Sequence, residues 1–226
     1  NESMSTTINI VSSADTFVTV NYPIRNFGVT TTHIDKALLR FDLSSIPTGM
    51  TCESATLKLY KGSAAGTLRA RVANLYKISD ANGDWIEGTK NNATALEGEP
   101  CWNAKEADDS GGVKVAWAGS EGLSTAGTDY LGTALAPQIT TERSDELGTE
   151  YTFTFNATGL SVLEEWFGNA TNNGFLVVET GAVNFCLREH ATEAYRPVLS
   201  VTYTSGGLLK SNMNAGMQNL SGGMRG

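Results

Sequence analysis

The sequence predicts an all-β fold, an antiparallel β-sandwich with one short helix. Two observations support this prediction. Apolar and polar residues alternate over many short runs, as expected for strands with one buried face and one face in water. Turn signals separate these runs, and many short strands with such punctuation are typical of a sandwich. The clearest turns are Ile46-Pro47-Thr48-Gly49, Asn82-Gly83, Gly111-Gly112 and Asn173-Gly174.

Four runs carry the strand pattern most clearly, at residues 37–43, 55–60, 151–155 and 199–203. Every second residue in them is apolar, so these residues should face the core. The expected inward residues are Ala37, Leu39, Phe41, Leu43, Ala55, Leu57, Leu59, Tyr151, Phe153, Phe155, Leu199, Val201 and Tyr203.

The pattern weakens between Glu87 and Glu150, where Gly, Ala, Thr, Asp and Glu dominate. This composition predicts loops with a few short strands. Binding residues are often found on such loops, because a rigid scaffold positions them while their sequence is free to vary.

One segment has helical spacing instead. Leu160, Leu163, Trp166 and Phe167 recur at helical intervals after Asn156. The spacing predicts a short helix from Leu160 to Phe167 that caps one end of the sandwich. Trp166 is then part of the core, and the side chain of Asn156 caps the start of the helix.

Residues 1–204 form the predicted sandwich, and residues 205–226 form a C-terminal extension rich in Gly, Ser and Asn. Apolar and polar residues alternate in the extension, which predicts a strand donated to the open edge of a neighbouring copy. Head-to-tail contacts of this kind would build a homopolymer, as a filament or surface layer. The N-terminal stretch 6–11 is the alternative donor. The expected assembly residues are Leu209, Met213, Ala215, Met217, Ile8 and Ile10.

Composition excludes some partners. The net charge is -8 and 18% of the residues are charged, so a nucleic-acid backbone would repel the chain. No apolar run approaches the roughly 18 residues that span a membrane. The chain begins at Asn1 rather than at Met, and from this we expect signal-peptide removal and an extracellular or cell-surface location.

Several motifs occur in a fixed order along residues 14–204. They are Ala14–Val18, Asn26–Gly28, Lys36–Pro47, Ser54–Tyr60, Asp84–Gly88, Cys101–Asn103, Tyr151–Phe167 and Leu187–Glu189. Together they resemble the DNRLRE-domain proteins, secreted β-sandwich proteins that include carbohydrate-binding modules. The first half of the naming motif departs from the family, because Asn184-Phe185-Cys186 stands there. The resemblance implies an antiparallel jelly-roll-like β-sandwich and an extracellular setting.

Two functions follow, and neither is catalytic. No catalytic motif occurs and the chain has only two histidines, so we expect no enzyme. The first function, favoured by the extension, is a structural subunit that assembles by strand addition. The alternative, implied by the resemblance, is a carbohydrate-binding module for an extracellular polysaccharide.

A carbohydrate site stacks sugar rings on aromatic side chains and surrounds them with polar groups. The candidates in or beside the loop region are Trp117, Trp85, Trp102 and Tyr130. Trp85 and Trp102 lie in motifs of the resemblance, so we favour a packing role for them. Trp117 is expected to be exposed.

Metal and modification sites are suggested more weakly. Asp80, Asn82 and Asp84 resemble the start of a calcium loop, but Asn91 stands where such a loop needs a bidentate Glu. We favour an Asn-Gly turn on an acidic surface, with structural calcium left open and no other cofactor indicated. A glycoprotein is indicated by four acceptor sequons, at Asn92, Asn156, Asn169 and Asn219. Those at Asn92 and Asn169 are in predicted loops.

The cysteines and one arginine complete the candidates. Cys52, Cys101 and Cys186 allow one disulfide and one thiol, or three thiols, and buried thiols are favoured. Arg188 could bind an acidic sugar. We favour an ion pair with a carboxylate inside the sandwich, for example Asp42.

Overall fold

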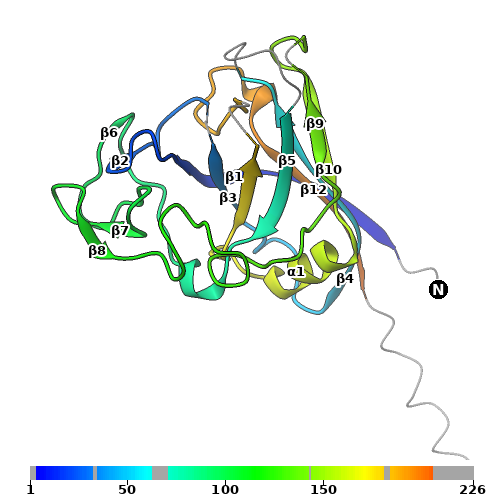
Figure 1. Cartoon of the computed structure of the whole chain (residues 1–226). Coiled ribbons are helices and arrows are strands. Elements are labelled where there is room, and N and C mark those ends of the chain that lie inside the picture. The colour runs from blue at the N-terminus through cyan, green and yellow to red at the C-terminus, as the bar shows by residue number, and fades with distance from the viewer. Residues whose placement is uncertain (1–3, 33–34, 63–70, 143, 181–183, 206–226) are drawn as a thin grey trace, which may run out of the picture.

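The computed structural model describes residues 4–32, 35–62, 71–142, 144–180 and 184–205. Over these residues the chain is an all-β sandwich with a single α-helix (Figure 1), which confirms the predicted fold class. Eight strands follow one another in the hydrogen-bonded order β10-β4-β12-β1-β3-β11-β5-β9. Their bounds are β1 Ser5–Val18, β3 Lys36–Phe41, β4 Met50–Tyr60, β5 Arg71–Lys77, β9 Ile139–Thr141, β10 Glu150–Thr154, β11 Phe175–Glu179 and β12 Val198–Ser205.

Strand β1 joins the two layers of the sandwich. Its first half pairs antiparallel with β12, and its second half pairs antiparallel with β3. The register shifts between Ser12 and Ala14, where the partner strand changes. A bulge bends a strand and increases its twist, so it allows β1 to pass from one layer to the other. We name these layers the first layer (β10-β4-β12-β1) and the second layer (β1-β3-β11-β5-β9).

The residues between the layers are those that alternation predicted. The inward residues from the four runs all belong to the main core, except Tyr151 and Tyr203, which are partly buried and pack against it. The second layer is also buried on its outer face, where Val18, Leu38 and Leu176 contribute to a second core. Residues of the 80–131 region cover this face, among them Trp85, Trp117 and Leu123.

Short elements lie in and around these loops. Strand β2 (Arg25–Asn26) pairs with β6 (Ala93–Thr94), and β7 (Glu106–Ala107) pairs with β8 (Val113–Val115). They form a lobe beside the sandwich (Figure 1). Two 3-10 turns, η1 (Asp80–Asn82) and η2 (Glu193–Tyr195), complete the described elements. The prediction of loops with a few short strands is therefore confirmed.

Helix α1 spans Ala157–Trp166, so it starts three residues before the predicted Leu160. It begins there because the Asn156 side chain accepts a hydrogen bond from the backbone N–H of Gly159 at 3.0 Å, as predicted for a cap. Trp166 is buried in the main core, as expected. The helix is also tied to β4, because the Glu164 carboxylate accepts from the backbone N–H of Cys52 at 2.7 Å.

Replacing Asn156 by alanine is expected to lower the free energy of unfolding by about 1–2 kcal/mol. The variant loses the cap and also the hydrogen bond that the Asn156 amide donates to the carbonyl of Ala134. Urea denaturation measures the loss. The control Thr158→Val removes the same sequon but keeps the cap, and should change stability little. An equal loss in both variants would assign the effect to something other than capping.

The N-terminal strand is part of its own sandwich. Ile8 lies opposite Val201 and Ile10 opposite Leu199, and both isoleucines pack against the main core. The structure therefore does not support the expectation that stretch 6–11 enters a neighbouring copy, because its apolar side chains are used within the chain. The other expected assembly residues, Leu209, Met213, Ala215 and Met217, lie outside the described residues, as does Asn219.

The three cysteines are buried and unpaired thiols. Burial raises the pKa of Cys52 and of Cys186 to about 11, so both thiols stay protonated at neutral pH. The favoured interpretation of buried thiols is thus confirmed. Within the described ranges, no helix has the length and apolarity that crossing a bilayer requires.

Candidate functional site

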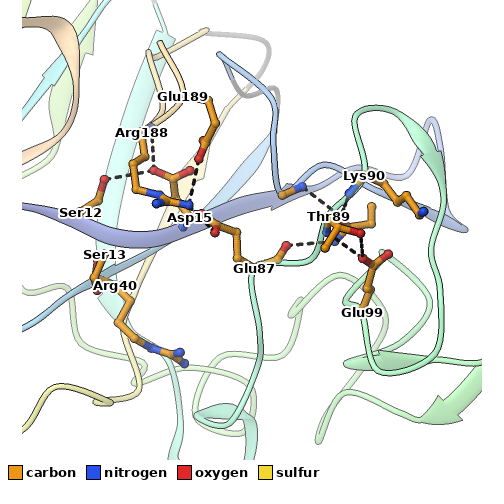
Figure 2. Close-up of polar contacts among 12 residues, drawn as sticks. Ser12, Ser13, Asp15, Arg40, Glu87, Thr89, Lys90, Glu99, Arg188 and Glu189 are labelled. Atoms are coloured by element: carbon orange, nitrogen blue, oxygen red, sulfur yellow. Dashed lines mark hydrogen bonds and ion pairs between the residues drawn. The ribbon is translucent and has the colours of Figure 1, made fainter. Parts of the chain in front are cut away.

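Three acidic residues from distant parts of the chain meet at one place (Figure 2). Asp15 comes from β1, Glu87 from the loop after η1, and Glu189 from the segment before η2. One carboxylate oxygen of each lies within 4.8 Å of those of the other two. We call these three residues the acidic cluster. Each belongs to a different sequence motif, and nothing in the sequence alone indicated that the motifs converge.

Arg188 is the cation of this cluster. Its Nε donates to Glu87 Oε1 at 3.1 Å and its Nη2 donates to Glu87 Oε2 at 2.5 Å, so the two side chains form a bidentate pair. The same Nη2 lies 3.0 Å from Glu189 Oε1. Burial alone would lower the pKa of Arg188, but hydrogen bonding to Glu87 and the surrounding carboxylates raise it. The guanidinium is therefore positively charged.

The specific partner predicted for Arg188 was wrong. Asp42 lies just beyond the end of β3 and is exposed, and its carboxylate accepts from the backbone N–H of Ser44 at 2.9 Å. These bonds with Ser44 lower the pKa of Asp42. The more general prediction, that Arg188 pairs with a carboxylate of its own chain, is confirmed, because Arg188 forms ion pairs with Glu87 and Glu189.

Asp15 is the most buried member of the cluster, with 0% of its surface exposed. Its Oδ2 accepts from the backbone N–H of Arg188 at 2.8 Å and from Ser12 Oγ at 3.1 Å, and its own backbone N–H donates to Glu87. Its Oδ1 has no hydrogen-bond partner among the described residues. Burial, and then the charge of Glu189, raise the pKa of Asp15 well above its usual value. Burial also raises the pKa of Glu189.

The residues that resembled a calcium loop have other partners. Asp84 accepts from Lys105 Nζ at 2.6 Å, and Asp80 accepts from the amide of Asn173 at 2.5 Å. The Asn82 side chain is buried and donates to Asp129 Oδ1 at 3.1 Å. The Asn-Gly turn is thus held by side-chain contacts. Among the described residues, the acidic cluster is the group of acidic, His or Cys side chains that could surround one ion.

Trp117 is not exposed, which corrects the prediction. Only 4% of its surface is accessible, it belongs to the second core, and its Nε1 donates to the carbonyl of Cys101 at 2.9 Å. The loop that carries Trp117 folds back over the outer face of the second layer, and the indole fills the space beneath it. Trp85 is equally buried, and its Nε1 donates to the carbonyl of Asn173 at 2.8 Å.

The remaining aromatic candidates pack against the second core as partly buried residues. Lys36 Nζ lies 5.1 Å from the ring centroid of Trp102 and donates to the carbonyl of Gly122, which follows β8. The ring of Tyr130 lies 4.7 Å from that of Tyr76, between centroids. The packing role favoured for Trp85 and Trp102 agrees with this placement.

The outer face of the first layer is mostly polar, with Val11 and Val198 as its apolar residues, and its side chains other than that of Thr204 are not buried. Cross-strand registers place its residues in rows over β1, β12, β4 and β10. Within these rows the hydroxyls of Thr7 and Thr202 lie 2.8 Å apart, and Ser200 donates to the Asn9 side chain at 2.5 Å. We define the open face as Thr7, Asn9, Thr56, Lys58, Tyr60, Glu150, Thr152, Ser200 and Thr202.

Three aromatic rings meet at one end of the open face. The ring centroid of Tyr195 lies 5.8 Å from that of Tyr60 and 5.7 Å from that of His190. Tyr195 lies against Gly148, whose φ of +80° favours glycine, and a Cβ at this position would come within 2.4 Å of the ring. Beside it, the Tyr60 hydroxyl donates to Glu150 Oε2 at 3.2 Å. No sequence pattern indicated that these rings meet, because their segments come together only across strands.

The predicted glycosylation sites have different surroundings. Asn92 is exposed, and its side-chain oxygen accepts from Arg25 Nη1 at 2.9 Å. Asn169 is exposed, and its side-chain oxygen accepts from the backbone N–H of Thr171 at 2.8 Å. Asn156 caps α1, as described above. Glycosylation of these residues stays a prediction.

Comparison with known proteins adds one finding. The family model described as carbohydrate-binding module family 96 matches residues 6–106. The matched stretch contains β1 to β6, with Asp15 and Glu87, and it ends before Arg188 and Glu189. No curated protein matches the chain, and the resemblance to DNRLRE-domain proteins stays a prediction. Over residues 6–106, the chain is therefore similar to a family of carbohydrate-binding modules.

Proposed function

We propose that this chain is a non-catalytic carbohydrate-binding module that holds an extracellular polysaccharide on the open face. One observation carries the proposal. The polar side chains of the open face are not covered by other parts of the described chain, and the rings of Tyr60, Tyr195 and His190 meet at one end of this face. The match to carbohydrate-binding module family 96 over residues 6–106 supports it. The self-assembling subunit is not proposed, because Ile8 and Ile10 of the alternative donor are used within the chain, and the residues of the favoured donor, Leu209, Met213, Ala215 and Met217, lie outside the described residues.

The chemistry of the open face suits a sugar. Each sugar hydroxyl is both a donor and an acceptor, and so are the Thr and Ser hydroxyls and the Asn amide that lie in these rows. The carboxylate of Glu150 and the ammonium of Lys58, 3.0 Å apart, add a strong acceptor and a strong donor. The apolar face of a pyranose packs on an aromatic plane, and Tyr60 and Tyr195 are partly exposed for this contact.

Replacing Tyr195 by alanine is expected to weaken polysaccharide binding by about tenfold or more, since a central aromatic contact contributes at least about 1.4 kcal/mol. Affinity gel electrophoresis with xylan, a β-glucan and alginate in separate gels measures retardation. Tyr60→Ala should weaken binding of the same polysaccharide. Thermal unfolding of each variant shows that the fold is kept.

The matched control is Tyr22→Ala. Tyr22 is an exposed tyrosine, 43% accessible, and it precedes β2 in the lobe away from the open face. Its removal should leave retardation unchanged. If Tyr22→Ala abolishes retardation and Tyr195→Ala does not, sugar is held on the lobe and the open face is the wrong site. If no polysaccharide retards the unmutated chain, the proposed function fails.

A further inference from the structure

We propose that the acidic cluster, Asp15, Glu87 and Glu189, binds one hard divalent cation such as Ca²⁺. The first argument is distance. Ca²⁺ binds oxygen ligands at 2.3–2.6 Å, so ligands on opposite sides of one ion lie at most about 5 Å apart. One oxygen from each of the three carboxylates lies within 4.8 Å of those of the other two. The three side chains therefore converge enough to share an ion without a change in the backbone.

The second argument is charge. Three carboxylates face a single guanidinium, that of Arg188, so negative charge is in excess at this point. Asp15 has no exposed surface, and only 19% of the Glu87 side chain is accessible. Buried charge is costly unless it is paired with an opposite charge or a metal. A divalent cation would cancel the excess that Arg188 leaves.

The third argument is a pair of oxygens without donors. Asp15 Oδ1 and Glu189 Oε2 are buried and have no hydrogen-bond partner among the described residues. Figure 2 shows the Asp15 and Glu189 carboxyl groups pointing towards one another. Ionised carboxylates are acceptors only, so two that face each other require a cation or a proton between them.

Asp129 shows how this fold satisfies a buried carboxylate without an ion. It is as buried as Asp15, yet both of its oxygens receive N–H donors. Oδ1 accepts from Gly119 at 2.7 Å and from Asn82 at 3.1 Å, while Oδ2 accepts from Ser120 at 3.0 Å and from Thr125 at 2.8 Å. Asp15 Oδ1 lacks any such donor. The fold thus supplies donors to both oxygens of one fully buried carboxylate and leaves Oδ1 of the other without one.

A proton is the competing explanation. The raised pKa of Asp15 and of Glu189, caused first by burial, allows one proton to lie between them. A proton would bridge only these two groups and would cancel one negative charge. A divalent cation can contact all three carboxylates and cancels two negative charges. We therefore favour the cation and make the proton an outcome of the test.

The test uses the full chain after EDTA treatment and dialysis, with CaCl₂ as the probe at pH 7.5. Isothermal titration calorimetry should show one Ca²⁺ bound per chain. Thermal unfolding should move up by about 5–10 °C when free Ca²⁺ is a hundredfold above its Kd. NaCl at matched ionic strength should not reproduce this shift. The experiment contains no glycan, so its outcome is independent of the proposed function.

Variants place the ion. Glu189→Gln keeps the shape of a partly exposed side chain and should abolish both the heat of binding and the shift in unfolding temperature. Asp80→Asn removes an exposed carboxylate from the turn that resembled a calcium loop, and should keep both. Loss of Ca²⁺ binding in Asp80→Asn alone would overturn the assignment. So would an unmutated chain that binds no Ca²⁺ under these conditions, because a proton shared by Asp15 and Glu189 would then be the explanation of the cluster.

Discussion

Replacing Trp117 by alanine is expected to lower the free energy of unfolding by about 3–5 kcal/mol, the usual loss for a fully buried large aromatic side chain. The indole is 4% accessible and lies in the second core with Leu123 and Ile78. Its removal leaves a cavity and also removes the donor to the buried carbonyl of Cys101. The 80–131 region covers the outer face of the second layer through the packing of this indole, so the loss of stability should be large.

Urea denaturation followed by circular dichroism measures this loss without relying on tryptophan fluorescence. The exposed aromatic Tyr22 supplies the comparison, and Tyr22→Ala should cost less than about 1 kcal/mol. A Trp117→Ala variant as stable as the unmutated chain would show that the indole is not packed as described. Any polysaccharide binding lost in Trp117→Ala should be attributed to unfolding unless the variant is shown to be folded.

Replacing Arg188 by glutamine is expected to lower the free energy of unfolding by about 2–3 kcal/mol in EDTA. Removing one partner of a buried ion pair usually costs about 3–5 kcal/mol, because the remaining charge is left uncompensated. The Arg188 side chain is 36% accessible, so water compensates part of that loss. Three neighbouring carboxylates would then face one another without a guanidinium between them.

Arg188→Lys is the matched control for this variant. Lysine keeps the positive charge but cannot form the bidentate bonds to Glu87, so its loss of stability should be intermediate. Equal losses of stability in the Gln and Lys variants would mean that the bidentate hydrogen bonds to Glu87 stabilise the fold and that the positive charge by itself does not. No loss in the Gln variant would show that the pair with Glu87 does not stabilise the fold.

The pH dependence of Arg188→Gln has a defined sign. Burial and the charge of Glu189 raise the pKa of Asp15 in the folded state, so the folded chain holds this proton more tightly than the unfolded chain does. Stability therefore increases as the pH falls towards about 4, the usual value for an aspartate. Without Arg188, the pKa of Glu189 should be higher still, because the charge of the guanidinium lowers it in the unmutated chain. The difference in stability between variant and unmutated chain should narrow from pH 7 to pH 5 in EDTA, and a constant difference would contradict this account.

Much of the fold could be predicted because its causes are local. A strand with one buried face has a period of two, so Leu57, Leu59 and Phe153 could be placed in the core from the sequence. The helix could be predicted from the spacing of Leu163 and Trp166, and its start from Asn156, since a cap acts within one turn.

The errors have a common physical origin. Alternation does not indicate whether the second face of a strand is covered, so the burial of Leu38 was not predicted. The cover comes from the 80–131 region, whose composition is that of an exposed loop. Trp117 was predicted to be exposed for the same reason, although an indole on such a loop can fill the core beneath it.

The order of apolar and polar residues by itself determined that this chain forms an antiparallel β-sandwich with a capped helix. Those patterns depend on neighbours a few positions apart in the sequence. Only the tertiary structure decided which side chains share a site, because Asp15, Glu87 and Glu189, like Tyr60 and Tyr195, are distant in sequence and meet only when strands pair across the sandwich. Charge repulsion, burial and ring contact act through space, and the candidate sites of this protein arise from such contacts.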